Sequence, residues 1–146
     1  MDNGRALLVV GGIVSGLIAL LHVVLAIRPG LFRYIGPGGG SALTEKATQG
    51  SIGIVVATIA LALMFALWAL YGLSGAGIIG KLPLLRTALI GISVIYLLRA
   101  MFIVPETRMV LSEGYSPRFL VFSGIALVAG LLYLVGTLTL RQHALE

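Results

Sequence analysis

Long runs of apolar residues fill most of the chain and are separated by short polar, glycine-containing or proline-containing stretches. A helix that crosses a bilayer needs roughly 20 predominantly apolar residues. The pattern predicts four such helices, over residues 6–27, 48–73, 83–104 and 117–140. Ser41 or Thr44 can cap the second helix, so that helix can begin near residue 42. We therefore expect an all-α protein, a four-helix transmembrane bundle in a single domain over residues 1–146.

Prolines and glycines mark where these segments end. Pro83 and Pro117 suit the first turn of a helix, whereas Pro105 suits a stop just past the third helix. Residues 36–41, with the sequence Gly-Pro-Gly-Gly-Gly-Ser, predict a flexible loop. Residues 106–116 mix apolar and charged side chains, which predicts an interfacial turn of helix. Because successive spans cross the membrane in opposite directions, the first and third connections lie at the same membrane face.

The composition agrees with a protein whose solvent is largely lipid. Of 146 residues, 59% are hydrophobic and 10% are charged, against about 25% charged in ordinary soluble domains. Cysteine is absent, Asp2 is the only aspartate, and His22 and His143 are the only histidines. We therefore expect no disulfide, no metal centre and no cofactor. The net charge of +5 is dispersed, which suits contact with membrane lipids and argues against nucleic-acid binding.

The orientation in the membrane is only weakly specified by the charges. Lysines and arginines are similarly frequent at both faces, so the positive-inside rule gives no clear asymmetry. Four spans place both termini on one side. We expect a multi-pass protein of the bacterial inner membrane with cytoplasmic termini, the common arrangement among small bacterial membrane proteins.

His22 and Arg99 are the most informative residues, because ionisable side chains inside apolar helices are costly and are usually functional. His22 precedes Pro29 by seven residues, and Arg99 precedes Pro105 by six. At 1.5 Å per residue, each lies roughly 9–10 Å inside the helix end that leads to the shared face. The sequence therefore predicts that the two residues lie at similar depth.

Other polar residues converge on the same face. Glu45 and Gln49 are four apart, and Tyr96 and Arg99 three apart, so each pair shares a helix side. We predict a ligand-binding pocket, with His22 and Glu45 as candidate catalytic groups, formed by His22, Glu45, Gln49, Tyr96, Arg99 and Glu106.

Each candidate also has a structural explanation. Arg99 can extend its charge to the interface, and His22 can be a neutral, hydrogen-bonded packing residue. Glu45 suits the dipole at a helix start, and Tyr96 can be an interfacial aromatic.

Trp68 and Tyr71, near the end of the second span, resemble an aromatic belt at the opposite face. Gly12 and Gly16 have the spacing that allows helices to approach closely, either within the bundle or in a homo-oligomer.

The polar set suits a bound amphipathic molecule. Arginine binds anionic head groups through two parallel hydrogen bonds, and histidine can exchange a proton near neutral pH. We expect the protein to bind a small lipid-, isoprenoid- or quinone-like molecule. Whether it also transforms this molecule is left open. An oligomeric small-solute or proton-coupled transporter or channel is the second hypothesis, and a structural or accessory membrane subunit is the third.

Two short motifs carry a resemblance. Leu20-Leu21-His22 ends the first span, and Thr44-Glu45-Lys46-Ala47-Thr48-Gln49-Gly50 opens the second. In these motifs the chain is similar to small bacterial four-span inner-membrane proteins of unknown function, which have a first-span histidine and a Gln-Gly pair opening the second span. The resemblance covers the first third of the chain and the topology, and it implies a site location without implying a reaction.

Overall fold

The computed structural model describes residues 3–35, 42–113 and 117–140; the glycine-rich stretch 36–41 lies outside them. All the elements assigned in the described ranges are helical, which confirms the expected all-α class. Four segments of the described chain are long and apolar enough to cross a membrane, namely α1 (Asn3–Ile27), α4 (Ile52–Gly75), the stretch Leu85–Ser112 and α7 (Arg118–Thr139). The chain is therefore a multi-pass membrane protein built as a four-helix bundle.

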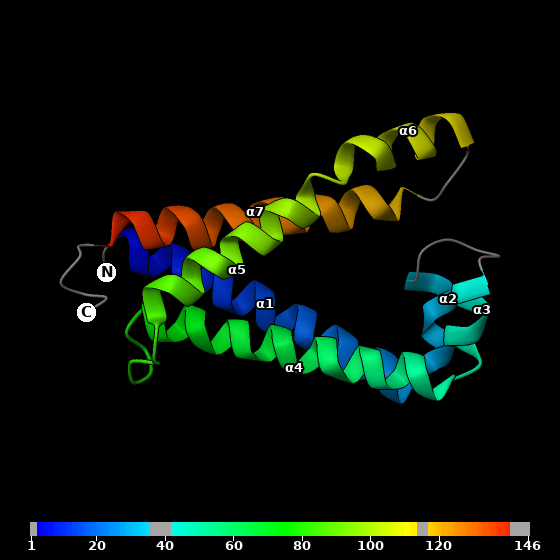
Figure 1. Ribbon diagram of the computed structural model, residues 1–146, viewed down its shortest axis with the longest axis horizontal. Helices are drawn as coiled ribbons and strands as arrows, with labels where there is room; N and C mark the ends of the chain where they lie inside the picture. The colour runs from blue at the N-terminus through cyan, green and yellow to red at the C-terminus, as the bar shows by residue number, and fades with distance from the viewer. Residues whose placement is uncertain (1–2, 36–41, 114–116, 141–146) are drawn as a thin grey trace.

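Shorter helices gather at one end of this bundle (Figure 1). After α1 the chain forms η1 (Pro29–Leu31), α2 (Phe32–Ile35) and α3 (Ala42–Thr48). The third segment consists of two helices, α5 (Leu85–Ala100) and α6 (Ile103–Glu113). A helix is thus present after α5 as α6, although it begins before residue 106; its position at the membrane interface stays a prediction.

The second segment is interrupted at Gly50, where a continuous helix from near residue 42 was expected. Gly50 has φ +71°, a left-handed conformation that glycine adopts without steric cost. Its N–H bonds to the Ala47 carbonyl at 3.0 Å, and the N–H of Ser51 bonds to the Lys46 carbonyl at 3.1 Å. This is the Schellman pattern that ends a helix. Glycine therefore separates the short α3 from the transmembrane α4.

Pro105 interrupts the third segment in a way that the sequence pattern did not predict. It lies in the first turn of α6, so it does not simply follow the end of a span. Proline has no N–H to bond to the carbonyl four residues earlier, which belongs to Met101, and its ring crowds that carbonyl. The helix consequently breaks at Met101 and Phe102, and α6 leaves in a new direction (Figure 1). The break places Glu106 in the first turn of a new helix, beside the end of α5.

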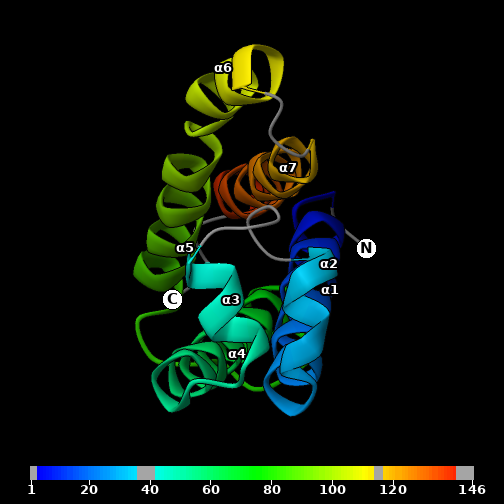
Figure 2. The same ribbon diagram turned by 90° about the vertical axis from the view of Figure 1, so that its right-hand side faces the viewer.

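The long helices pack as two pairs. The most extensive contacts are those of α1 with α4 and of α5 with α7, and α1 also packs along α7. The pairs lie close together at the end that holds the start of α1 and separate toward the end that holds α2, α3 and α6 (Figures 1 and 2). At the second end, Arg118 at the start of α7 donates a hydrogen bond to the Tyr34 carbonyl of α2. Apart from Tyr96, which is buried in the core, the candidate polar residues lie on the helix segments near the end where the two pairs diverge.

Glycines allow the closest helix contacts. A Cβ built at Gly72 of α4 would lie 2.9 Å from the Cα of Gly12 on α1. A Cβ at Gly136 of α7 would lie 2.9 Å from the Leu8 side chain of α1. Gly12 thus allows close packing within the monomer, which is one of the two alternatives that the sequence left open. A homo-oligomer through this face stays a prediction.

The core corrects the assignment of Trp68 to an aromatic belt. Its side chain is buried, and its ring packs edge-on against Tyr96 with centroids 4.9 Å apart. Leu8, Leu89 and Tyr133 are fully buried in the same cluster. Trp68 therefore belongs to the interior of the bundle, whereas Tyr71 is partly exposed and donates to the Pro83 carbonyl at 3.2 Å.

We predict that Gly72→Ala destabilises the protein, because the new methyl group would meet the backbone of α1. Overpacking of this kind typically costs about 1–3 kcal/mol. Gly53→Ala is the matched control in the same helix, since a Cβ there meets nothing within 4 Å. Thermal unfolding in detergent should show a lower midpoint for Gly72→Ala and an unchanged or slightly higher one for Gly53→Ala. Equal midpoints for the two variants would contradict the close α1–α4 contact.

Candidate functional site

A chain of hydrogen bonds joins all four long helices in the middle of the bundle. The Ser15 hydroxyl of α1 lies 2.9 Å from the Tyr96 hydroxyl of α5 and 3.0 Å from the Tyr133 hydroxyl of α7. Tyr133 in turn donates to the Trp68 carbonyl of α4 at 2.8 Å. Ser15 and Tyr133 are both fully buried. Each of the four helices therefore contributes one group to a continuous buried chain.

The direction of this chain follows from counting donors. A carbonyl only accepts, so the single hydroxyl proton of Tyr133 is used in its bond to Trp68. Ser15 must then donate to Tyr133, and Tyr96 must donate to Ser15. The polar atoms are all paired by one another, which is what an apolar, water-free interior requires. The chain therefore fixes the bundle and leaves none of these three protons for other partners.

Aromatic rings continue from this chain to His22. Tyr133 and Tyr96 are stacked with centroids 6.0 Å apart, and Tyr96 is stacked on Phe65 at 6.1 Å. The Phe65 ring lies 5.2 Å from the His22 imidazole. His22 is half-buried between α1 and α4 at the outer end of this row.

The hydrogen bond of His22 sets its tautomer. Nδ1 lies 2.8 Å from the Ile18 carbonyl, one turn earlier in α1. Because the carbonyl only accepts, Nδ1 carries a proton, and Nε2 of the neutral ring is then an acceptor. Within the described part of the chain, His22 makes no hydrogen bond to Arg99, Glu45 or Gln49. The imidazole is therefore oriented by its own helix, with Nε2 left for another group.

Arg99 forms a second polar cluster, together with Glu106 and Ser123. Nη1 of Arg99 donates to Glu106 Oε1 at 3.0 Å and to Ser123 Oγ at 2.8 Å. The Ser123 hydroxyl donates to Glu106 Oε2. Glu106 retains 12% of its side-chain exposure, and Arg99 retains 41%. We call these three residues the arginine cluster; it ties together the end of α5, the start of α6 and α7.

The electrostatic setting of the arginine cluster is favourable on both sides of the helix break. Arg99 is in the last turn of α5, where the helix dipole presents partial negative charge. Glu106 is in the first turn of α6, where partial positive charge favours a carboxylate. The Phe102 ring lies 5.9 Å from Arg99 Cζ, within cation–π range. The guanidinium is therefore oriented by several contacts.

Glu45 and Gln49 lie apart from both groups. The Gln49 amide donates to Glu45 Oε1 at 3.4 Å; Glu45 is in the first turn of α3, Gln49 follows its last residue, and both side chains are exposed. No other hydrogen bond is found for either side chain among the described residues. The pair retains the i, i+4 contact that the sequence predicts, at the surface of this end of the bundle.

The structure thus brings together some of the six predicted residues and separates others. Arg99 and Glu106 are in direct contact, Tyr96 is in the interior chain, and His22 reaches Tyr96 only through Phe65. Sequence reasoning did not include Ser15, Ser123, Tyr133 or Trp68. Ser15, Ser123 and Tyr133 are isolated polar side chains in apolar runs, which is the one signal that could have drawn attention to them; Trp68 contributes its backbone carbonyl, which no sequence signal marks.

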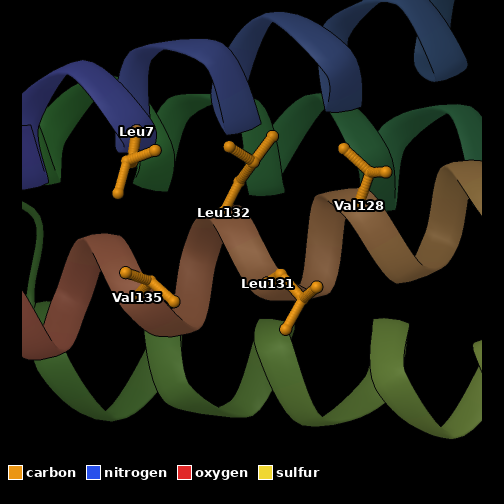
Figure 3. Close-up of a pocket in the computed structure, with 5 residues that line it drawn as sticks. All are labelled: Leu7, Val128, Leu131, Leu132 and Val135. Atoms are coloured by element: carbon orange, nitrogen blue, oxygen red, sulfur yellow. The ribbon is translucent and has the colours of Figure 1, made fainter.

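An apolar hollow of about 220 Å³ lies between α1 and α7 (Figure 3). Its lining is aliphatic throughout and consists of Leu7, Val128, Leu131, Leu132 and Val135. Leu132 is nine residues from Ser123, which at 100° per residue puts it on the opposite side of α7. The hollow has no polar group to orient a ligand and is separate from the arginine cluster.

We predict that Ser15→Ala lowers stability because it removes two hydrogen bonds between helices. Interhelical hydrogen bonds in membranes contribute about 0.6–2 kcal/mol each. Ser93→Ala is the matched control, since Ser93 is equally buried but donates to the Ile90 carbonyl of its own helix at 2.7 Å. Thermal unfolding in detergent should give a larger loss for Ser15→Ala. A loss of the same size in both variants would mean that the chain of hydrogen bonds does not hold the helices together.

Comparison with known proteins identifies no relative. The chain matches none of the protein-family models, curated protein sequences or solved structures with which it was compared. The geometry of the arginine cluster and of His22 is therefore the basis for a functional interpretation.

Proposed function

We propose that this protein binds a small amphipathic molecule of the bilayer, lipid-, isoprenoid- or quinone-like, at the membrane face that holds the arginine cluster. The observation that carries the proposal is how Arg99 is paired and exposed. It is a permanently charged group near the end of an apolar helix, held by Glu106 and Ser123, yet with 41% of its side chain exposed. A charge kept within reach of the bilayer and fixed in orientation is suited to the polar head of such a molecule.

His22 supports the proposal as a second oriented polar group at the same end of the bundle. Its Nδ1 is engaged by Ile18, so Nε2 can accept a hydrogen bond from a hydroxyl-bearing head group. The neighbouring Phe65 offers an apolar face for the rest of the molecule. His22 and Glu45 stay candidates for proton transfer, should the ligand also be transformed.

A transport function finds less support. The second hypothesis requires polar groups that continue across the membrane. Thr58 of α4 and Ser93 of α5, the polar residues inside these two apolar helices, each donate to a carbonyl of their own helix at 2.7 Å. The Ser15 hydroxyl is fully buried and already paired. These three polar side chains are therefore paired within the protein and do not line a continuous path across the membrane.

Under the third hypothesis the polar residues only stabilise the bundle, and residues other than Arg99 already do this. The hydrogen-bonded chain through Ser15 already joins the four helices without any charge. Interhelical hydrogen bonds are modest in energy, so stability alone is a weak reason to keep Arg99 in an apolar helix. We place the protein in the bacterial inner membrane with cytoplasmic termini as part of the same proposal.

We predict that Arg99→Gln reduces the amount of amphipathic molecule that the purified protein retains by at least about tenfold, because a hydrogen bond to a charged group contributes about 1.5–3 kcal/mol. The bound molecules would be extracted after extensive washing in detergent and quantified by mass spectrometry. Arg86→Gln is the matched control, an exposed arginine at the opposite end of α5.

Thermal unfolding of both variants would establish that each is folded. Retention by the original protein and by Arg86→Gln, together with loss in Arg99→Gln, is the expected result. Absence of any retained amphipathic molecule in the original protein would refute the proposal.

A further inference from the structure

The hydrogen bonds of Arg99 are made by one nitrogen of its guanidinium and leave the opposite edge unpaired. A guanidinium carries five N–H groups, two on each Nη and one on Nε. Nη1 makes the contacts to Glu106 and Ser123, which use both of its hydrogens. Within the described residues, no hydrogen bond leaves from Nε or Nη2. The pair of parallel donors on the Nε–Nη2 edge is therefore free.

The ion pair with Glu106 uses one nitrogen of the guanidinium, Nη1. Arginine and a carboxylate can join through two parallel hydrogen bonds, and that arrangement would occupy a full edge of the guanidinium. Here a single Nη1 to Oε1 contact of 3.0 Å is made, and the other carboxylate oxygen accepts from Ser123. The ring of Phe102 lies 5.9 Å from Cζ. These contacts fix the direction of the guanidinium without using its Nε–Nη2 edge.

We propose that the free Nε–Nη2 edge of Arg99 binds an oxyanion, phosphate or carboxylate, of the amphipathic ligand. The inference rests on the proposed function and narrows its ligand class to molecules with an anionic head. Two oxygens of one phosphate or carboxylate match the spacing of the two parallel donors, which a single carbonyl or hydroxyl oxygen does not.

The charge at this membrane face favours the same ligand. Basic residues outnumber acidic ones among the described charged side chains at this end of the bundle. Besides Arg99, the basic residues of this end are Arg28, Arg33, Lys46, Arg108 and Arg118. Their long-range field attracts anions to the face, while the fixed edge of Arg99 supplies the specific contact.

The inference is tested by comparing two lipids that share their acyl chains and differ in whether the head carries an oxyanion. Phosphatidylglycerol, which has a phosphate group, and diacylglycerol, which has none, would each be titrated into the delipidated, detergent-purified protein, and binding would be measured by native mass spectrometry. We expect phosphatidylglycerol to bind more tightly. Arg99→Lys keeps the charge but lacks the paired donors, so it should weaken phosphatidylglycerol binding by about tenfold. Arg86→Lys, the matched control, should leave both affinities unchanged.

A second variant tests the inference by a gain of binding, which misfolding cannot produce. Glu106→Gln keeps a carbonyl oxygen that can accept from Nη1 but removes the negative charge beside the guanidinium. The affinity for phosphatidylglycerol should then rise severalfold, with little change for diacylglycerol. An unchanged or lower affinity of a folded Glu106→Gln protein for phosphatidylglycerol would count against the inference.

The source of the oxyanion is resolved by adding inorganic phosphate to the same titrations. Competition by millimolar phosphate would show that a free anion can occupy the edge, whereas no competition would assign it to a lipid head group; both agree with an oxyanion site. Equal binding of the two lipids, with no effect of Arg99→Lys, would overturn the inference and leave the proposed function standing. Failure of every amphipathic molecule to bind would overturn both.

Discussion

The chain of hydrogen bonds from Tyr96 through Ser15 and Tyr133 to the Trp68 carbonyl is the interaction on which the rest of the arrangement depends. Lipid offers no water to replace a missing partner, so these buried hydroxyls are satisfied only when all four helices adopt one rotation and one relative depth. Apolar side chains alone would pack in several registers at similar energy. The buried polar chain therefore selects the register, and the positions of the residues at both ends of the bundle follow from it.

The two ends then differ for steric reasons. At one end, glycines such as Gly72 and Gly136 let the backbones approach, and the helix pairs lie close together. At the other end the pairs separate, and Pro105 breaks the third segment before it leaves the bundle. That break allows a residue just beyond it, Glu106, to turn back to Arg99 in the preceding helix. A straight helix would carry residues seven apart about 10 Å along its axis.

The chemistry available to the protein follows from this division. The interior hydroxyls donate only to one another and to a backbone carbonyl, so the centre of the bundle is structural. The free capacity for hydrogen bonding lies at the diverging end, on the unpaired Nε–Nη2 edge of Arg99 and on Nε2 of His22. A site at one face suits recognition of a molecule that is itself half polar and half apolar. This division of roles is why ligand binding is favoured over conduction across the membrane.

The sequence by itself determined the membrane class, the four spans and the all-α fold, because the length of an apolar run and its proline and glycine boundaries are local properties. It also pointed to Arg99 and Glu106, since charges near apolar segments stand out. The tertiary structure decided which groups pair. Ser15 meets its tyrosine partners 81 and 118 residues away, and Ser123 meets Glu106 across a helix break. Such contacts depend on the rotation of each helix about its axis, and a nearly uniform apolar surface does not encode that rotation in any local pattern.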